Sequence, residues 1–328
     1  MIQIQTLRKS FGATDILKGI DLEIAEGEFV TLLGQSGCGK STLLRIIAGL
    51  ERADTGQLSC DGAVLDDPAR SRFVPTQARR FGFVFQDHAL WPHMSIDDNI
   101  AFPLRSAGWR KSEMAARVRE VLEQVQMAEH AGKSPRQLSG GQRQRVGIAR
   151  ALALSPRVLL LDEPLASLDS NLRDDLGHEI RKLSKQFGLT CINVTHDRRE
   201  AQILSDRIAV MEGGRIQQVG APLEVFTRPG TVGIARFVNA GNIVPRAFLD
   251  GGPWTDDWLL VPRNALQIAP AGGEVTAKVQ DMVFIDGRFE VKVEARGQEL
   301  TFFSESRPSE SGQIELTVRR ETVVPLPA

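Results

Sequence analysis

A glycine-rich segment of this sequence has the spacing of a phosphate-binding loop. Residues 34–41 match the pattern GxxxxGK[ST], follow the apolar run 29–33 and enter the helix-compatible stretch 42–48. In such a loop the backbone N–H groups close around phosphate oxygens, and the positive end of the following helix strengthens the attraction. Lys40 would reach the β- and γ-phosphates, and Ser41 would bind Mg²⁺. The candidate nucleotide contacts are Gly34, Ser36, Gly37, Cys38, Gly39, Lys40, Ser41 and Thr42. An ordinary glycine turn is the alternative, and the flanking strand and helix argue against it.

Two neighbouring carboxylates follow a second apolar run. The run Val158–Leu161 ends in Asp162 and Glu163, which predicts a buried parallel strand that delivers both acids at its carboxyl end. Asp162 would complete the shell of a bound Mg²⁺, while Glu163 would orient the attacking water and take its proton. In the structural alternative, both acids simply cap a helix that begins at Pro164.

A third segment is a second phosphate-compatible helix start in the same chain. Ser139, Gly140, Gly141 and Gln142 precede the helical pattern of residues 146–152. Ser139 is a natural N-cap, and exposed N–H groups at the two glycines suit an anion such as a γ-phosphate. Taken by itself, the segment fits equally well an N-cap followed by a glycine hinge.

Together these segments resemble the nucleotide-binding subunit of an ATP-binding cassette (ABC) transporter. Over residues 1–235 the motifs occur in the family's order: the Walker A loop at 34–41, the Q-loop glutamine Gln86, the signature LSGGQ at 138–142, the Walker B strand at 159–163, the D-loop at 167–169 and the switch histidine His196. The resemblance implies that His196 contacts the γ-phosphate, and that Gln86 senses Mg²⁺ and water and couples the site to a permease.

The resemblance also implies a homodimer in which each ATP lies between two chains. Ser139, Gly140, Gly141 and Gln142 of one copy would face the γ-phosphate held by Lys40 of the other, and Asp169 would lie at the subunit boundary. Hydrolysis would therefore require the dimer.

The family's adenine-stacking aromatic residue has one candidate in this sequence. Phe11 lies 29 positions before Lys40, and its ring could stack on the base. Packing in the core of an N-terminal sheet is the alternative for this residue.

The motifs require a mixed α/β scaffold, and the pattern changes after it. We expect an α/β P-loop nucleotide-binding domain at residues 1–238, with a helical subdomain at about residues 87–155 that includes an amphipathic helix over 112–128. Residues 239–328 alternate in polarity, with turns at Asp286-Gly287 and Arg296-Gly297, and this predicts a small all-β barrel. It resembles the oligonucleotide-binding (OB)-like module of binding-protein-dependent importers.

One loop segment has the features of a partner-binding surface. Residues 87–95 resemble the cleft that receives a permease helix in importers, with Trp91 and Met94 as the contacts. Local core packing is the alternative for both. His88 and His93 are five positions apart without a third ligand nearby, so we expect no metal there.

Composition limits the remaining possibilities. The chain has 328 residues, which favours two domains, and its 40 basic and 41 acidic residues give a charge of −1. We therefore expect no nucleic-acid partner. The three cysteines form no CxxC pair and should be free thiols. With no signal peptide and no membrane-spanning run visible, we expect a cytoplasmic protein that reaches the membrane through a partner.

The resemblance predicts an ATPase that drives an importer. As a homodimer with Mg²⁺ and ATP, it would act on integral membrane permease subunits, which receive a polyamine, ferric iron, a sugar or a similar solute from a binding protein. A soluble cassette ATPase acting on ribosomes or DNA is the main alternative. A regulatory binding module with weak ATP turnover is a further one, although Glu163 and His196 are both present.

Overall fold

The computed structural model describes residues 2–87, 89–269, 272–308 and 312–327. The chain forms two compact units, Met1–Pro222 and Leu223–Ala328. No helix in the described ranges is both long enough and apolar enough to cross a membrane.

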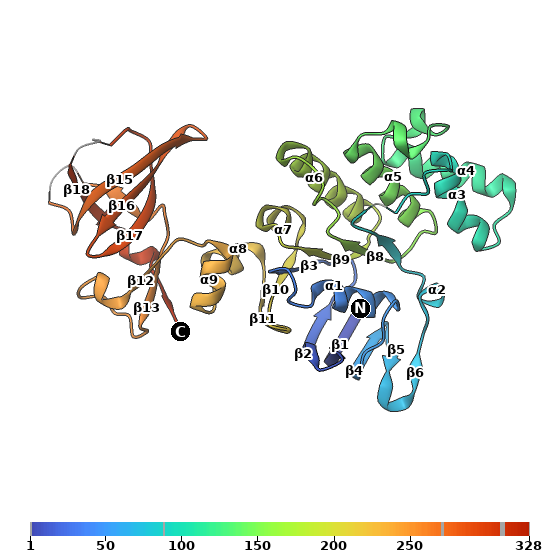
Figure 1. Cartoon of the computed structure of the whole chain (residues 1–328), viewed down its shortest axis with the longest axis horizontal. Helices are drawn as coiled ribbons and strands as arrows, with labels where there is room; N and C mark the ends of the chain where they lie inside the picture. Colours follow the sequence, from blue (N-terminus) through green and yellow to red (C-terminus); the bar gives the residue numbers. More distant parts are fainter. Residues whose placement is uncertain (1, 88, 270–271, 309–311, 328) are drawn as a thin grey trace. The chain divides into compact units, whose positions relative to one another are not determined.

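The first unit is built on a six-stranded sheet (Figure 1). In spatial order its strands are β11 (Arg215–Gly220), β10 (Arg207–Glu212), β3 (Phe29–Gly34), β9 (Thr190–Thr195), β8 (Val158–Asp162) and β7 (Gly82–Val84). All neighbouring pairs are parallel except β10 with β11. Because the carboxyl ends of parallel strands meet at one edge, the loops after β3, β7, β8 and β9 gather there.

Side chains of β8 divide between two hydrophobic cores. Leu159 and Leu161 pack with the helices of one face, whereas Val158 and Leu160 pack with α1 (Lys40–Ala48) on the other. All five residues of β8 are buried, so the buried parallel strand predicted from its apolar run is confirmed.

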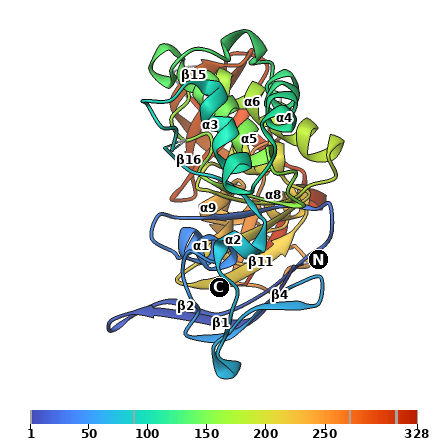
Figure 2. The same cartoon turned by 90° about the vertical axis from the view of Figure 1, so that its right-hand side faces the viewer.

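A second, antiparallel sheet closes the core around α1 (Figures 1 and 2). Its strands, in spatial order, are β2 (Thr14–Ile24), β1 (Ile2–Phe11), β4 (Thr55–Cys60), β5 (Ala63–Asp67) and β6 (Arg72–Phe73). The short helix α2 (Thr76–Arg79) follows it. Helix α1 is therefore buried between two sheets, and its first turn lies at the edge where the parallel strands end.

Helices cover the other face of the six-stranded sheet. They are α5 (Gly140–Leu152), α6 (Ser170–Gln186) and the shorter α7 (Arg198–Leu204), while α3 (Ile96–Ser106) and α4 (Lys111–Gln124) pack against each other and against α5. The helix predicted over 112–128 ends at Gln124, since Gln126 adopts the left-handed φ of 58° that interrupts the helical hydrogen bonds. Short 3₁₀ turns at Ala128–His130 and Pro135–Gln137 lead to α5.

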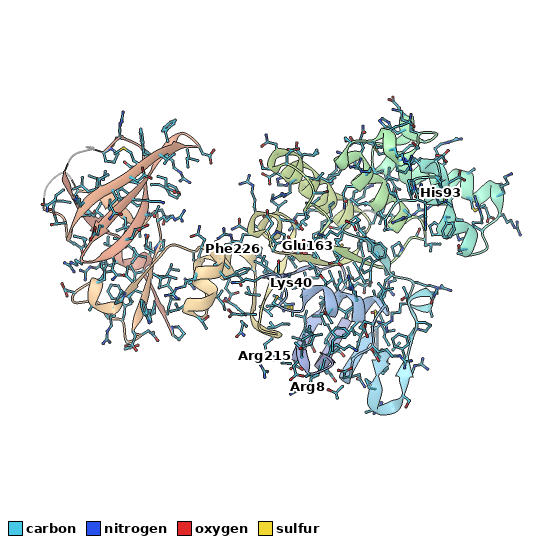
Figure 3. All side chains as sticks on the ribbon, in the orientation of Figure 1. Arg8, Lys40, His93, Glu163, Arg215 and Phe226 are labelled. Carbon is cyan, nitrogen blue, oxygen red and sulfur yellow. The ribbon has the colours of Figure 1, made fainter. Side chains whose placement is uncertain are left out.

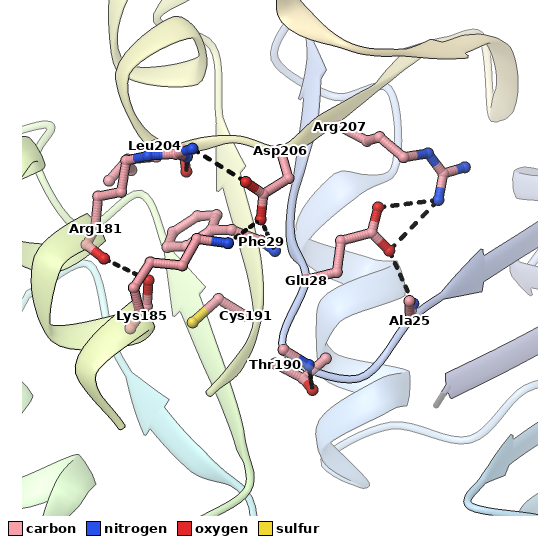
Figure 4. Close-up of polar contacts among 12 residues, drawn as sticks. Ala25, Glu28, Phe29, Arg181, Lys185, Thr190, Cys191, Leu204, Asp206 and Arg207 are labelled. Atoms are coloured by element: carbon pink, nitrogen blue, oxygen red, sulfur yellow. Dashed lines mark hydrogen bonds and ion pairs between the residues drawn. The ribbon is translucent and has the colours of Figure 1, made fainter. Parts of the chain in front are cut away.

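Polar contacts at the amino ends of β3 and β10 anchor α6 to the sheet (Figure 4). Asp206 accepts hydrogen bonds from the Phe29 N–H at 2.9 Å and from Arg181 Nη2 at 3.0 Å, and it pairs with Lys185 Nζ at 2.6 Å. These contacts lie at the opposite end of the strands from the phosphate loop, so they stabilise the fold and take no part in the phosphate-binding edge.

The second unit is mostly antiparallel β-structure. Helices α8 (Pro222–Thr227) and α9 (Val232–Val238) precede a three-stranded sheet of β12 (Asn242–Pro245), β13 (Trp258–Val261) and β19 (Val324–Leu326). A five-stranded sheet contains, in spatial order, β14 (Leu266–Ile268), β18 (Gln313–Val318), β15 (Val275–Ile285), β16 (Arg288–Ala295) and β17 (Gln298–Ser304). These strands form a half-barrel that fits an OB-like domain, as the sequence predicts.

The alternation in polarity explains the core of this second unit. Val275, Ala277, Val291 and Val293 point inward and are buried. Both predicted turns exist, because Asp286-Gly287 and Arg296-Gly297 have positive φ at both residues, as two-residue hairpin turns require.

Candidate functional site

The phosphate loop connects β3 to α1 and depends on glycine at three positions. A Cβ on Gly34 would lie 2.4 Å from the Met211 carbonyl oxygen, so any side chain there would collide with β10. Gly37 and Gly39 have φ of 82° and 105°, in the left-handed region that strains other residues. Residues 35–37 are exposed, which leaves the curved backbone accessible to a ligand.

Lys40 begins α1 and folds back over this loop. Its Nζ donates to the carbonyl oxygens of Gly34 at 2.8 Å and of Gln35 at 2.9 Å, and the residue is only 4% exposed. Cys38 is also buried, with its Sγ 3.8 Å from Lys40 Nζ. The ammonium group is thus held against the backbone of the loop, and Figure 3 shows Lys40 near the start of α1.

Ser41 and Asp162 meet although 121 positions separate them in the sequence. Ser41 Oγ donates to Asp162 Oδ1 at 3.0 Å, and Asp162 is 7% exposed. Burial raises the pKa of the Asp162 carboxyl, while the bond from Ser41 opposes this shift. A buried carboxylate beside a hydroxyl offers hard oxygen ligands and lacks full charge compensation, so a divalent cation such as Mg²⁺ fits this pair.

Glu163 and His196 form a second pair at the same edge. Glu163 Oε2 lies 3.4 Å from His196 Nδ1, and the His196 side chain is 53% exposed. Glu163 has a left-handed φ of 47°, and its N–H donates to the Val194 carbonyl oxygen of β9 at 3.0 Å. This backbone turn brings the acid to the end of β9, which His196 directly follows in the chain.

The structure also places three further predicted residues. Gln86 is exposed and lies two residues beyond β7, while Thr42 is half-buried in the first turn of α1. Phe11 ends β1 with 50% of its surface exposed, and Lys9 Nζ lies 5.0 Å from its ring centroid. Core packing, the alternative for Phe11, therefore does not describe its position.

The signature segment lies apart from the phosphate loop. Ser139 caps α5, accepting from the Gln142 N–H at 3.3 Å while Gln142 Oε1 accepts from the Ser139 N–H at 2.9 Å. Helix α5 packs on the opposite face of the six-stranded sheet from α1 (Figure 1). Among the described residues, no hydrogen bond joins Ser139, Gly140, Gly141 or Gln142 to residues 34–41.

The two signature glycines allow α5 to approach the D-loop closely. A Cβ on Gly141 would lie 2.9 Å from Leu172 Cδ2, and one on Gly140 would lie 3.2 Å from Leu168 Cδ2. Asp169 caps α6 by accepting from the Leu172 N–H at 3.0 Å. The structure therefore brings the signature and D-loop together as one surface of the helical side.

The segment that contains Trp91 and Met94 is held by two buried side chains that sequence reasoning missed. Asn99 Oδ1 accepts from the Trp91 N–H at 2.8 Å, and its Nδ2 donates to the Trp91 and Ser95 carbonyl oxygens. Arg150, near the end of α5, donates to the Ala89 carbonyl oxygen at 2.5 Å and lies 5.1 Å from the Trp91 ring centroid. The segment is therefore fixed in shape.

Trp91 and Met94 are both half-buried, so each keeps part of its surface accessible. The Trp91 ring packs 4.5 Å from Phe102 of α3, so part of it serves local packing. His88 lies outside the described residues, and His93 is exposed. Within the described ranges, no three His, Cys, Asp or Glu side chains are grouped to hold a metal ion.

A cavity of about 830 Å³ opens between α3 and α4. Its lining is mixed, with Ala101, Met114, Val118 and Leu122 among the apolar residues and Asp97, Arg105 and Arg119 among the charged ones. Burial raises the pKa of Asp97, and the neighbouring Asp98 adds to the shift.

Two other missed residues, Arg173 and Glu200, lie behind His196. Glu200 is 2% exposed, and Arg173 pairs with Asp197 at 2.5 Å. No local sequence pattern identifies such residues, because their hydrogen-bond and ion-pair partners lie on other helices and strands.

Comparison with known proteins agrees with this geometry. Residues 17–166 match the family model described as ABC transporter. The chain is 47% identical over 244 residues to a spermidine/putrescine import ATP-binding protein of Nitratidesulfovibrio vulgaris, covering 74% of this chain and 65% of that protein. It is 50% identical over 248 residues to a sulfate/thiosulfate import ATP-binding protein of Xylella fastidiosa (74% and 70% covered). It is 42% identical over 278 residues to a trehalose/maltose import ATP-binding protein of Thermococcus litoralis (85% and 74% covered).

Solved structures show the same fold. A dimeric ATP-binding cassette in a post-hydrolysis state, bound to ADP and Pi, is similar to this chain with a TM-score of 0.59 and 34% identity. The similarity covers 68% of this chain and 99% of that one.

Proposed function

This chain belongs to the ABC transporter family, and from that premise we propose that it is the ATP-hydrolysing subunit of an importer. The observation that carries the proposal is the meeting of two pairs, Ser41 with Asp162 and Glu163 with His196, at the strand edge that holds the phosphate loop. The relatives named as import ATP-binding proteins support the importer assignment.

The side chains at this edge have different roles in ATP binding and hydrolysis. The N–H groups of residues 34–41 and the Lys40 ammonium bind the phosphates, and Phe11 stacks on the adenine. Glu163 accepts a hydrogen bond from the attacking water and takes its proton, and its carboxylate lies within reach of such a water because it is partly exposed, at 18%. His196 contacts the γ-phosphate and orients Glu163.

Ser41, Asp162 and Gln86 would hold Mg²⁺. When bound, the cation neutralises charge that develops on the phosphate oxygens. Asp162 and Ser41 already lie together, so the protein's contribution is a preformed pair of oxygen ligands.

We propose that the second phosphate-compatible helix start, at the beginning of α5, belongs to the ATP site of another copy of the chain. Ser139, Gly140, Gly141 and Gln142 would complete the γ-phosphate site of the partner, and Asp169 would lie at the boundary between the two chains. Two observations support this: α5 begins on the other face of the sheet from α1, and the similar cassette is dimeric.

We propose that permease subunits dock on the segment around Trp91 and Met94 and in the cavity between α3 and α4. The rigid support of this segment by Asn99 and Arg150 favours a docking role, because a fixed surface binds with less loss of conformational entropy. The chain would then lie on the cytoplasmic face of the membrane, and a binding protein would deliver the solute to the permease. A polyamine, a sugar, sulfate or ferric iron fits the class; no nucleic acid is involved.

In this assignment residues 1–238 serve nucleotide binding and residues 239–328 form the barrel domain. Helix α9 packs through Val232 and Ala235 against Leu260 and Leu326, all within the second compact unit. The barrel contributes to dimer contact or regulation.

The proposed function is tested with the Glu163→Gln variant. Loss of the water-activating group should lower ATP turnover by about a hundredfold or more and trap an ATP-bound dimer that size-exclusion chromatography resolves. Glu212→Gln, at the exposed end of β10, is the matched control and should turn over ATP like the unaltered chain. Wild-type turnover by Glu163→Gln would refute the assignment of Glu163.

The partner is identified by purification of the tagged chain from detergent-solubilised native membranes with ATP present, followed by mass spectrometry. Recovery of a polytopic membrane protein supports the importer assignment. An eluate enriched instead in ribosomes or DNA would replace it with a soluble cassette ATPase, and would remove the docking role of Trp91 and Met94.

A further inference from the structure

A closed set of hydrogen bonds lies beneath the segment that carries His196. Its central group is the Glu200 carboxylate in the first turn of α7, which is only 2% exposed. Glu200 Oε1 accepts from Asn193 Nδ2 at 2.9 Å, and Glu200 Oε2 accepts from Thr195 Oγ1 at 3.1 Å. One buried side chain thus holds two residues of β9.

The same set fixes the residue after His196. Thr195 Oγ1 accepts from the Asp197 N–H at 3.0 Å, and Asp197 Oδ1 accepts from the Glu200 N–H at 3.0 Å. Glu200 therefore restrains the backbone on both sides of His196, through Thr195 before it and Asp197 after it.

Arg173 of α6 closes the set from the side of the D-loop. Its Nη1 pairs with Asp197 Oδ2 at 2.5 Å, and its Nη2 donates to the Leu168 carbonyl oxygen at 2.8 Å. The residue just before Asp169 is thereby tied to the residue just after His196.

We propose that Glu200 is a positioning residue for ATP hydrolysis: its buried carboxylate holds residues 195–197 so that the His196 imidazole stays beside Glu163. The proposal rests on the proposed function, because it assigns to Glu200 an effect on the pair that performs hydrolysis. Glu200 touches neither nucleotide nor water, and it acts only through the backbone of its neighbours.

The observed bonding pattern fits the ionised form of Glu200. Both of its oxygens accept from donors, the Asn193 amide and the Thr195 hydroxyl. A protonated carboxyl would carry its proton on one of these oxygens, and the Thr195 hydroxyl would have to turn and accept it in place of donating. Burial raises the pKa of Glu200 to about 7; the hydrogen bonds from Asn193 and Thr195 oppose this, nearby Asp197 raises the pKa further, and Arg173 lowers it. The set should therefore be complete above neutrality and weaken as the pH falls through about 7.

The test compares Glu200→Gln and Glu200→Asp with the unaltered full-length chain, with kcat and KM for ATP measured from about pH 6 to about pH 8.5. The amide keeps one acceptor oxygen and places an NH₂ donor where the second acceptor stood, so the Thr195 hydroxyl must turn to remain bonded. We therefore expect kcat of Glu200→Gln at the alkaline end to fall by about tenfold to a hundredfold. KM should stay within about twofold, since nucleotide contacts are untouched. The rise of kcat across neutrality should be smaller in Glu200→Gln, whereas Glu200→Asp, which retains a carboxylate, should keep it.

Asp174→Asn is the matched control. It removes the contact between Asp174 Oδ2 and Arg199 Nε at 2.6 Å, which also joins α6 to α7 but lies outside the set. Its kinetics should match the unaltered chain. If Glu200→Gln folds and its pH profile and kcat equal those of the unaltered chain, the proposal is overturned. If it does not fold, Glu200→Asp decides, because its shorter side chain reaches Asn193 and Thr195 less well. A lowered kcat that keeps its rise across neutrality, with unchanged KM, supports positioning, and a kcat equal to that of the unaltered chain at every pH refutes it. An unaltered chain without ATP turnover would instead refute the proposed function.

Discussion

Arg79 offers a direct test of how the phosphate-binding helix is supported. Its guanidinium is buried at the carboxyl end of α1, where it donates to the carbonyl oxygens of Ile46 at 2.6 Å and Ile47 at 2.7 Å, and also to that of Val74 at 2.7 Å. Burial lowers the pKa of Arg79 to about 10, so the group remains charged at neutral pH. A positive charge at this end of a helix also complements the helix dipole.

The substitution Arg79→Met keeps most of the side-chain volume and removes every donor. Each hydrogen bond from a charged donor contributes about 1.5–3 kcal/mol, and a carbonyl left buried without a partner costs about 1–3 kcal/mol. Because the three bonds share one group and are not additive, we expect a loss of about 3–5 kcal/mol. For a unit of this size the loss lowers the midpoint of thermal unfolding by about 6–20 °C.

The control is Arg52→Met. Arg52 lies over the same Phe73 ring as Arg79, at 4.2 Å from its centroid, but its side chain is exposed. Loss of that cation–π contact should cost only about 0.5–1 kcal/mol. Scanning calorimetry measures both variants, and the transition of the first unit is recognised by its shift when ATP is added. If Arg79→Met lowers that transition no more than Arg52→Met does, the hydrogen bonds to α1 do not stabilise the unit.

Three further substitutions address individual roles. Phe11→Ala should raise the KM for ATP by roughly tenfold with little change in kcat, whereas Phe11→Trp should preserve both; steady-state kinetics that show equal KM values for the two variants would contradict stacking. Asp162→Asn should reduce hydrolysis by about a hundredfold or more and shift its Mg²⁺ requirement to higher concentration; a Mg²⁺ titration that matches the unaltered chain would exclude Asp162 as a ligand. Arg150→Met should release the Trp91 segment and reduce permease recovery in co-purification, while basal turnover changes by less than about twofold; full recovery of the permease would show that this support is dispensable.

The sequence predicted best what depends on neighbouring residues. The apolar run before Asp162, the alternation in the second unit and the turn at Asp286-Gly287 each follow from local pattern, and each is confirmed. The pairing of Ser41 with Asp162 also follows, since two parallel strands that end at one edge bring their loops together.

The sequence could not identify side chains whose role depends on distant partners. Arg79 bonds to carbonyl oxygens 32 and 33 positions away, and Arg150 bonds to one 61 positions away. The sequence around each of these two arginines resembles that around a solvent-exposed arginine. Only the folded structure shows that both are buried and hydrogen-bonded. The predicted end of α4, at residue 128, was also wrong. The apolar spacing continues through Val125, but the left-handed turn at Gln126 ends the helix.

In the proposed dimer each ATP site is composite, because it combines the phosphate loop of one chain with the signature segment of the other. Two variants that are inactive alone should therefore restore ATP hydrolysis when they are mixed. Lys40→Ala disables the phosphate loop of a chain, and Ser139→Asp keeps an N-cap of α5, because Asp caps as well as Ser, while placing a negative charge opposite the γ-phosphate. In a mixed dimer one site combines both changes, but the other combines an intact loop with an intact signature. Half of the dimers in an equal mixture are mixed, so about a quarter of the normal activity should return if sites turn over independently. If Ser139 only caps its own helix, Ser139→Asp will be active alone, and the composite site will have to be abandoned.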